Sequence, residues 1–289
     1  MAADTSGTGE KGGTVQSRVG DDLHVDLAGQ STYAGYLDLK TLFSAHKPLT
    51  NSHDEHVFII IHHVQELWMK LLDYEIALAI DGIRNDDLRP ALKALARVGR
   101  VQEQLISAWD VLSTMTPADY LVFRGALGTA SGFQSYQYRK LEFRLGAKDS
   151  RMLLPHRHTP DIHAELETAL KEPSIYDEAL RLVARRGFAV PKSALERDFS
   201  QPYVFNAAVR DVWLDIYRQS QRYFELYELA EKLVDVEDRF QQWRFRHMKT
   251  VERIIGYKPG TGGSSGVGYL KTALEHSFFP ELWEVRTFL

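Results

Sequence analysis

The chain has 289 residues and no cysteine, which excludes disulfide scaffolds, thiolate metal sites, iron–sulfur clusters and cysteine nucleophiles. Hydrophobic residues make up 44% and charged residues 26%, and 35 basic against 39 acidic side chains give a net charge of −4. This balance is typical of a globular protein and argues against a nucleic-acid binder, which normally carries a basic stripe. Because no apolar run approaches about 18 residues and no secretory signal begins the chain, we expect a cytoplasmic protein without membrane contact.

The first 30 residues differ in composition from the remainder. Residues 1–30 are rich in Gly, Ser, Thr and charge and show little apolar periodicity, which predicts a mobile leader. From residue 31 onward the pattern changes to long stretches with apolar residues at three- and four-residue steps. Since the apolar stretches on either side of a proline-rich middle region could not bury their faces alone, we expect residues 31–289 to form one domain.

Four long stretches carry a helical pattern. They run over residues 57–72, with Asn51 or Ser52 as N-cap, and over 88–115, 213–233 and 236–255, the last ending at Gly256. No Asn-Gly or Asp-Gly turn joins two runs of alternating apolar residues, so strand signals are poor. The sequence therefore predicts an all-α fold, a helical bundle.

A histidine-rich segment opens the first of these helices. His53 and His56 lie about one helical turn apart, as do His62 and Glu66, so a non-haem metal site is conceivable on spacing. The alternative is that these are cap residues and hydrogen-bonded core histidines, since the spacing is not that of a known zinc motif. His62 is the informative residue. It lies within the apolar face one turn after Phe58, where an imidazole needs a partner or a ligand.

Tyr120 and Arg124 form a pair four residues apart. On a helix the phenol and the guanidinium would project from the same side, which suits the grip of a carboxylate by a fork and one hydroxyl. The alternative is an arginine paired with a nearby acid.

His247 shares the apolar stripe of a late helix. A lone histidine on such a face is usually a satisfied core residue, and otherwise a ligand-binding one. Without cysteine, a neutral imidazole is the strong axial ligand that the chain offers to a haem, which the flanking Trp243 and Phe245 could cover.

A glycine-rich loop follows that helix at residues 260–266. It lacks the lysine of a phosphate-binding P-loop, and its glycine spacing differs from the dinucleotide fingerprint. A flexible loop that closes over a ligand and presents Thr261 is the better interpretation.

Taken together, six separated strings resemble the tryptophan 2,3-dioxygenase family and occur in the family's order from about Tyr33 to the end of the chain. They are Thr32-Tyr-Ala-Gly-Tyr-Leu37, His53-Asp-Glu55 running to Phe58 and His62, Glu66-Leu-Trp68, Ser131-Gly-Phe-Gln-Ser135, Trp243-Arg-Phe-Arg-His247 and Gly260-Thr-Gly-Gly-Ser-Ser-Gly266. The resemblance implies an all-α haem b enzyme, usually a homotetramer, whose ferrous form opens the indole ring of L-tryptophan with O₂. The product would be N-formylkynurenine, the first intermediate of tryptophan catabolism by the kynurenine pathway.

The resemblance also implies residue roles. His247 would be the axial ligand of the haem iron, and His62 the catalytic histidine that accepts the indole N–H. The further roles carried over are substrate binding by Phe58, Tyr120, Arg124 and Thr261, completion of the indole pocket by Tyr33 and Tyr36 of a neighbouring subunit, and positions near the haem for Trp109 and Ser131.

Four positions depart from the family's pattern. They are His63 after the distal histidine, His56 in place of an apolar residue, and Gly125 with Ala126 after Arg124. These departures leave open a relative that inserts one oxygen atom and converts tryptophan or a β-methyltryptophan to a 2-oxindole. A non-catalytic sensor of haem or tryptophan, and a helical interaction protein without a cofactor, are the further alternatives.

Overall fold

The computed structural model describes residues 27–289 and divides them into two units, which meet in the sequence between His46 and Lys47. Each unit is described by itself. Residues 1–26 of the predicted leader lie outside the described residues, so its boundary at residue 30 stays a prediction.

The described part of the first unit, residues 27–46, contains two short helices. Helix α1 (Tyr33–Tyr36) begins at Thr32, whose hydroxyl accepts a hydrogen bond from the Gly35 backbone N–H at 3.0 Å. Helix α2 (Leu39–Ser44) follows Asp38. Neither helix contains a buried residue, and Tyr33 and Tyr36 are 78% and 82% exposed. These helices therefore gain little from packing within their own unit.

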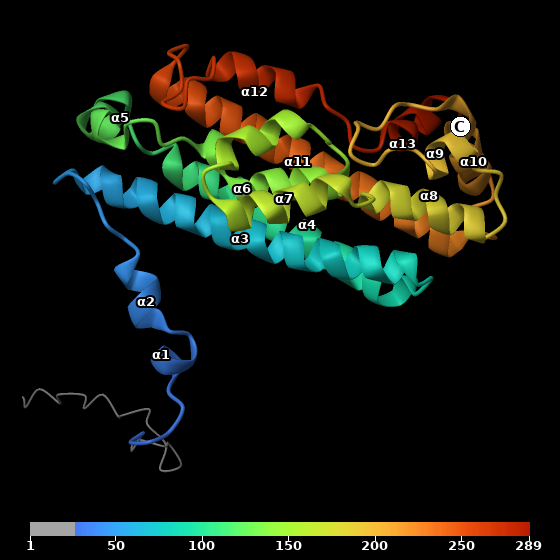
Figure 1. Cartoon of the computed structure of the whole chain (residues 1–289), viewed down its shortest axis with the longest axis horizontal. Coiled ribbons are helices and arrows are strands. Elements are labelled where there is room, and N and C mark those ends of the chain that lie inside the picture. Colours follow the sequence, from blue (N-terminus) through green and yellow to red (C-terminus); the bar gives the residue numbers. More distant parts are fainter. Residues whose placement is uncertain (1–26) are drawn as a thin grey trace, which may run out of the picture. The chain divides into compact units, whose positions relative to one another are not determined.

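Three long helices form the centre of the second unit. They are α3 (His53–Arg84), α4 (Leu88–Leu112) and α11 (Phe224–Ile255), and both α3 and α11 pack along α4 (Figure 1). A short turn joins α3 to α4, so the first half of α3 lies beside the second half of α4. Apolar residues at three- and four-residue steps, such as Leu72, Ile76, Ile80 and Ile83 on α3, supply the buried face. Burial of each is worth about 1.5–3 kcal/mol, which fixes the pairing of these helices.

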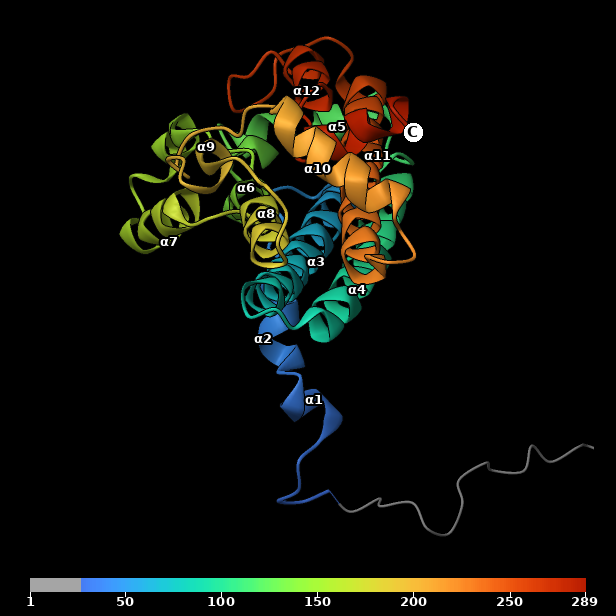
Figure 2. The ribbon, with the colours of Figure 1, turned by 90° about the vertical axis from the view of Figure 1, so that its right-hand side faces the viewer.

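Shorter helices cover the two ends and the sides of this centre, as Figures 1 and 2 show. They are α5 (Pro117–Arg124), α6 (Tyr136–Leu145), α7 (Pro160–Lys171), α8 (Ile175–Arg185), α9 (Lys192–Leu195), α10 (Ala207–Arg218), α12 (Val267–Leu274) and α13 (Pro280–Glu284). Single turns of 3₁₀-helix occur at Gly125–Leu127, Gly132–Gln134 and Val285–Thr287, and a longer one at Ser150–His156. Helices α5 and α12 lie at one end, and α10 and α13 at the other.

The predicted fold class is confirmed, because residues 27–289 contain helices and no strand. None of the helices in this range combines the length and apolar character needed to cross a membrane.

The predicted boundary between the last two long helices is wrong. The sequence favoured helices over 213–233 and 236–255, with a break at residues 234 and 235. In the structure the break falls at residues 219–223, between α10 and α11, and α11 runs without interruption through residues 234 and 235. Leu229, Leu233, Val236 and Phe240 continue one buried stripe across the expected gap, so packing against α4 keeps the helix intact there.

Ser52 is the N-cap residue of α3, as one of the two predicted positions, but another side chain makes the hydrogen bonds at this helix start. Ser52 occupies the N-cap but makes no side-chain cap hydrogen bond. Instead the buried Glu55 carboxylate accepts hydrogen bonds from the Leu49 and Thr50 backbone N–H groups at 2.6 and 2.7 Å. The acidic residue thus stabilises the chain's entry into the helix, where the helix dipole also favours negative charge.

Candidate functional site

An internal cavity of about 210 Å³ lies where the first half of α3, the second half of α4 and the last turns of α11 come together. A smaller void of about 100 Å³ adjoins it. The residues that line both are Phe58, His62, Trp109, Tyr120, His247, Val251 and Ile255. The walls are therefore largely apolar and aromatic, and two imidazoles face one space. We call this space the histidine cavity.

His62 has a tautomer that its surroundings define. Its Nδ1 lies 2.6 Å from the carbonyl oxygen of Phe58, one helical turn earlier. Because a carbonyl only accepts, Nδ1 must carry the proton, and in a neutral ring Nε2 is then an acceptor. Burial lowers the pKa of His62, with a smaller contribution in the same direction from His63. His62 thus presents an unprotonated nitrogen at neutral pH.

His247 enters the same cavity from α11. Burial lowers its pKa to about 4, and the nearby His62 adds to this shift. Its ring stacks on the Trp109 indole with a centroid separation of 4.6 Å and an interplanar angle of 10°. Within residues 27–289 neither ring nitrogen forms a hydrogen bond. The side chain is a neutral imidazole with its lone pair available, so the alternative of a satisfied core histidine does not apply.

Phe58 and Tyr120 form the wall next to His62. The Phe58 ring centroid lies 4.1 Å from that of His62 and 6.1 Å from that of Tyr120. Burial raises the pKa of Tyr120, and the charge of the nearby Arg124 opposes this rise. Arg124 Nη2 donates a hydrogen bond to the Pro259 carbonyl at 2.7 Å. The two side chains of the predicted pair are close to each other, but only Tyr120 is among the residues that line the cavity. The arginine is partnered by a backbone carbonyl rather than by an acid.

The glycine-rich loop packs against the segment that contains Ser131. Thr261 donates its hydroxyl proton to the Ala130 carbonyl at 2.5 Å, and both Thr261 and Ser131 line the cavity. A Cβ added at Gly262 would lie 2.7 Å from the Ser131 Cβ, so only glycine allows this close approach. Gly266 has φ of +61° and leaves no room for a Cβ beside the Lys258 carbonyl. The loop covers the cavity in this arrangement.

Two features of this region escaped the sequence analysis. Gln65, one turn after His62, accepts from Trp243 Nε1 and donates to the Leu105 carbonyl, both at 3.0 Å, and so fixes the Trp243 ring at the cavity wall. The second is a buried cluster on α6 and α11, in which Glu142 pairs with Arg139 and Arg244. A polar residue within an apolar face was the available signal for Gln65. Glu66, which the sequence suggested as a partner of His62, also lines the cavity, and burial raises its pKa against a hydrogen bond with Ser135.

The structure does not bring every predicted residue to the cavity. Tyr33 and Tyr36 belong to the first unit, so their roles stay predictions. Phe245, expected to cover a porphyrin, is 47% exposed and lines a different groove, because it faces away from the stripe of His247. The positions that depart from the family's pattern, His56, His63, Gly125 and Ala126, do not line the cavity either.

The donor set fits a haem better than a bare metal ion. Among residues 27–289 no group of three or more His, Asp or Glu side chains could hold a metal. A haem needs one neutral imidazole and apolar walls, and His247 and its surroundings supply both. Trp109 Nε1 is buried in the cavity wall and has no hydrogen-bond partner within the described chain, which marks a place where a bound group could accept one.

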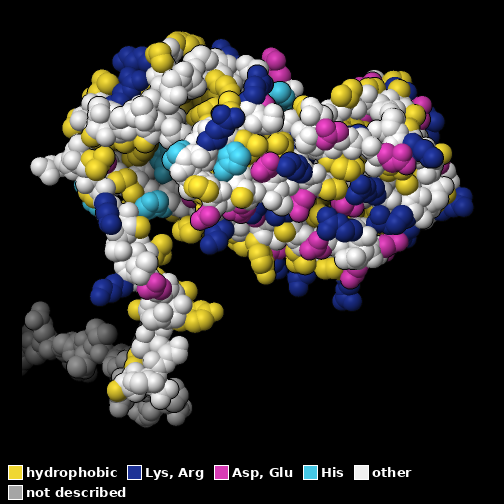
Figure 3. All heavy atoms as spheres, viewed as in Figure 1, with side chains coloured by type: hydrophobic (Ala, Val, Ile, Leu, Met, Phe, Trp, Pro, Cys, Tyr) yellow, Lys and Arg dark blue, Asp and Glu magenta, His cyan; other side chains and the backbone are white. Residues whose placement is uncertain are grey.

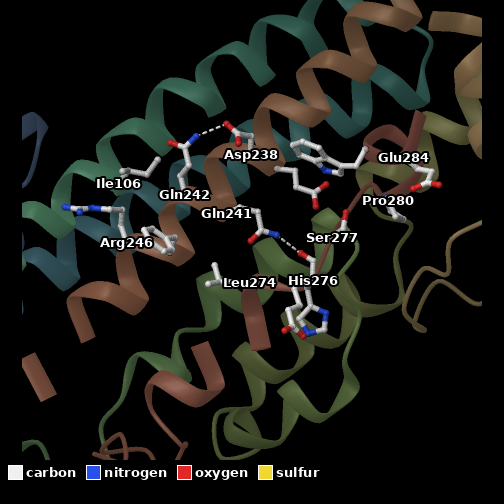
Figure 4. Close-up of a pocket in the computed structure, with 14 residues that line it drawn as sticks. Ile106, Asp238, Gln241, Gln242, Arg246, Leu274, His276, Ser277, Pro280 and Glu284 are labelled. Carbon is white, nitrogen blue, oxygen red and sulfur yellow. Dashed lines mark hydrogen bonds between the residues drawn. The ribbon is translucent and has the colours of Figure 1, made fainter. Parts of the chain in front are cut away.

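Another large hollow lies elsewhere on the described residues. It is an open groove of about 850 Å³ between α11, α4 and the segment before α13, and Figure 4 shows its side chains, with Gln242 donating to Asp238 and Gln241 to the His276 carbonyl. Basic and acidic side chains also intermingle over much of the face of the second unit shown in Figure 3. Neither feature brings together the groups found in the histidine cavity.

Comparisons with known proteins identify the family to which the chain is similar. The sequence model of the family described as tryptophan 2,3-dioxygenase matches residues 20–289. The chain is 53% identical to the tryptophan 2,3-dioxygenase of Bacillus thuringiensis (strain Al Hakam) over 265 residues, which cover 92% of this chain and 95% of that protein. It is 54% identical to the protein of the same name from Polaromonas sp. over 276 residues, which cover 95% of this chain and 94% of that protein. It is 53% identical to the protein of that name from Paraburkholderia phytofirmans, over 93% of this chain and 88% of that protein.

Proposed function

The chain belongs to the tryptophan 2,3-dioxygenase family, and we propose how the residues of its histidine cavity carry out the family's reaction. The protein is an enzyme that uses O₂ to open the indole ring of L-tryptophan and yields N-formylkynurenine. One observation carries the assignment of the site. Two neutral imidazoles from α3 and α11 line one aromatic cavity, and each has a nitrogen lone pair available.

We assign His247 as the ligand that holds haem b. Its pKa near 4 keeps the ring unprotonated at any physiological pH, as metal ligation requires. Trp109 packs flat against its ring and limits rotation, and Trp243 is held in turn by Gln65. Bound there, ferrous haem supplies the redox-active iron that activates O₂.

Arg124, Tyr120 and Thr261 are proposed to bind the amino-acid head group of the substrate. The guanidinium offers a planar fork for the carboxylate, and the nearby Tyr120 hydroxyl adds a further contact. The Thr261 hydroxyl lies in the same cavity wall. Because Arg124 also donates to the Pro259 carbonyl at the start of the loop, binding of the carboxylate would be coupled to the position of the loop.

His62 orients the indole. Its Nε2 accepts the indole N–H, since Nδ1 is already committed to the Phe58 carbonyl. Phe58 lies against His62 and provides the apolar surface on which the indole packs. The residues around the ring thus contribute positioning rather than strong acid or base, and a fixed near-attack geometry can account for a large part of a rate enhancement.

The loop of residues 260–266 excludes water. Its hydrogen bond from Thr261 to Ala130 and the contact of Gly262 with Ser131 close the cavity over the substrate site. A dry cavity strengthens the ionic contact of Arg124 and protects the reacting groups from stray protons.

The proposal extends to assembly. The exposed tyrosines of α1, Tyr33 and Tyr36, would complete the indole pocket of a neighbouring subunit in a homotetramer. Family membership supports such an assembly and a cytoplasmic location. Sedimentation of the purified protein tests the tetramer, and loss of turnover in Tyr36→Ala with an unchanged Soret band tests the role of α1.

Product analysis with ¹⁸O₂ tests the reaction. The ferrous, haem-loaded protein with L-tryptophan should give N-formylkynurenine carrying two labelled oxygens without added reductant. A product with one labelled oxygen, obtained only with an external reductant, would instead identify the 2-oxindole reaction. Nothing in the cavity favours that alternative, because the residues that prompted it lie outside its walls.

A further inference from the structure

The imidazole of His247 is not oriented in the way that is usual for a histidine bound to a metal. Such a histidine normally donates the proton of its second ring nitrogen to a carboxylate or a backbone carbonyl, which fixes the plane of the ring. Within the part of the chain that the structure describes, neither nitrogen of His247 has a hydrogen-bond partner. Among these residues the orientation of the ring therefore depends on packing.

Two indole rings supply this packing. Trp109 of α4 stacks on the imidazole, with a centroid separation of 4.6 Å and an interplanar angle of 10°. Trp243 precedes His247 by one turn of α11, and its ring lies 5.5 Å from the imidazole at an angle of 35°. The two indoles also contact each other, with their centroids 5.6 Å apart. We call Trp109 and Trp243 the indole clamp, because rotation of either ring would change the space in which the imidazole can turn.

The side chain of Gln65 on α3 anchors the indole clamp. It is 3% exposed; its Oε1 accepts from Trp243 Nε1, and its Nε2 donates to the Leu105 carbonyl, both at 3.0 Å. Because an indole N–H only donates and a carbonyl only accepts, a single orientation of the amide satisfies both groups. Leu105 precedes Trp109 by one turn of α4. The amide therefore ties Trp243 to the helix that carries the other indole.

The indole clamp has no second polar anchor at its other ring. Trp109 Nε1 is buried and has no hydrogen-bond partner among residues 27–289, so packing alone holds that ring. An indole N–H that is buried without an acceptor is unfavourable, so Trp243 would reorient if the amide of Gln65 were removed. The hydrogen bond between Gln65 and Trp243 is thus the contact that determines the geometry of the clamp.

We propose that Gln65 is a positioning residue that, through Trp243, fixes the orientation of the His247 imidazole and hence the strength of its bond to the haem iron. The inference rests on the proposed function, since it takes His247 as the haem ligand. Both polar atoms of the Gln65 amide are used within the protein, so Gln65 acts through Trp243 and not on the substrate. His62 lies one turn earlier on α3. One helix thus orients the group that accepts the indole N–H and, through Gln65, the group that holds the iron.

Gln65→Met and Gln102→Met form a matched pair of variants. Gln102 is 1% exposed and its Nε2 donates to the Val236 carbonyl at 2.9 Å, so it also links two long helices through a buried amide. Gln65 is among the residues that line the histidine cavity, whereas Gln102 is not. A loss of stability common to both variants therefore reports a structural role, and a change confined to Gln65→Met reports the indole clamp.

The first measurement uses the haem-free full chain and follows the indole N–H of Trp243 by NMR with ¹⁵N-labelled tryptophan. The signal is assigned by its absence in Trp243→Phe. Gln65→Met should accelerate the solvent exchange of this proton about tenfold or more, and Gln102→Met should leave the rate within about twofold of the wild type. Gln65→Glu keeps an acceptor oxygen for Trp243 and should retain part of the protection.

The second measurement uses the ferrous, haem-loaded protein. In Gln65→Met the iron–histidine stretching band in the resonance Raman spectrum should shift and broaden, and haem affinity should fall by about tenfold or more, as is typical when a residue that orients a metal ligand is lost. Gln102→Met should keep the wild-type band and affinity. At saturating haem, kcat for L-tryptophan should fall in Gln65→Met while KM stays within about twofold, because the proposed substrate-binding residues are unchanged.

A double-mutant cycle tests whether Gln65 acts through Trp243. Trp243→Phe keeps an aromatic ring and removes the N–H, so it should shift the iron–histidine band as Gln65→Met does. In the Trp243→Phe background, Gln65→Met should add no further shift. A full additional shift would overturn the assigned route.

Three further outcomes would overturn the inference. They are an iron–histidine band and haem affinity in Gln65→Met equal to those of the wild type, equal changes in Gln65→Met and Gln102→Met, and a Trp243 N–H that stays protected in Gln65→Met. In each case a Soret band that is lost in His247→Ala would leave the proposed function intact. A wild-type Soret band that does not depend on His247 would contradict both the proposed function and this inference.

Discussion

The two ends of the second unit both bury ionisable side chains, but they satisfy them differently. At the end formed by α8, α10 and α13, the Glu281 carboxylate accepts from the Tyr176 and Tyr203 hydroxyls, each at 2.9 Å, and from the Asn206 backbone N–H at 2.7 Å. Trp213 Nε1 donates to the Tyr176 hydroxyl at 3.1 Å. Every member of this cluster has a partner, so the cluster can stabilise the fold but offers nothing to a ligand.

At the other end, the buried groups face a cavity. His62 Nε2, both nitrogens of His247 and Trp109 Nε1 have no partner within the described residues. Burial shifts pKa values at both ends, since it raises the pKa of Tyr176 and lowers that of His247. A shifted pKa therefore does not by itself distinguish a structural cluster from a site. What distinguishes them is whether the polar atom faces a partner or a cavity.

The largest effect should come from Glu281→Ala at the closed end. Removal of the carboxylate strands two phenols and a backbone N–H in the interior, and we expect the free energy of unfolding to fall by about 3–5 kcal/mol. Urea unfolding followed by circular dichroism measures it. Glu281→Gln keeps one acceptor oxygen, so its free energy of unfolding should fall by less than that of Glu281→Ala. Equal stability of Glu281→Ala and the wild type would show that the closed cluster contributes nothing.

His247→Ala should produce the opposite result at the open end. The change removes no hydrogen bond between described residues, so unfolding of the haem-free protein should shift by about 1 kcal/mol or less. Haem affinity should fall by about 100-fold or more, because the axial ligand is lost. Soret titration gives the affinity. A Soret band that survives unchanged would refute the assigned ligand.

Arg124→Ala should affect the substrate and leave the haem in place. Loss of a charge-assisted fork should cost about 2–3 kcal/mol, or roughly a 30- to 150-fold increase in the KM for L-tryptophan. Arg253→Ala is the control, since this exposed arginine donates to the Ser113 carbonyl, whereas Arg124 donates to the Pro259 carbonyl beside the glycine-rich loop. Steady-state kinetics distinguishes the two variants, and identical KM values would remove Arg124 from substrate binding.

The smallest effect should appear in the pH profile. The pKa of His62 is lowered from 6.5 by burial, so the neutral ring that accepts the indole N–H persists below pH 6.5. We therefore expect kcat/KM to stay flat as pH falls from about 8 to 6.5 and to decline only at lower pH. The free energy of unfolding should also decrease as pH falls below 6.5. In that range the unfolded chain protonates His62 more readily than the folded chain does. A decline centred at or above 6.5 that is absent in His62→Ala would contradict the lowered pKa.

Much of the histidine cavity could be predicted from the sequence. Phe58 and His62 share one helix face, as do Tyr120 and Arg124, because a four-residue step repeats on any helix. The sequence could not predict that His63 and Gly125 would lie outside the cavity walls, since that depends on how α3 and α5 are rotated against α4 and α11. The roles of Tyr33 and Tyr36 stay predictions.

The sequence by itself determined the helical class and the candidate residues of the histidine cavity, because helix periodicity and side-chain chemistry are local properties. Only the tertiary structure decided which polar groups are satisfied. Arg139 and Glu142 are near neighbours on α6, yet the second cation on Glu142 is Arg244, which is 102 positions away in the sequence. The pairing of two buried cations with one carboxylate depends on residues far apart in the sequence, and only folding brings them into one low-dielectric space.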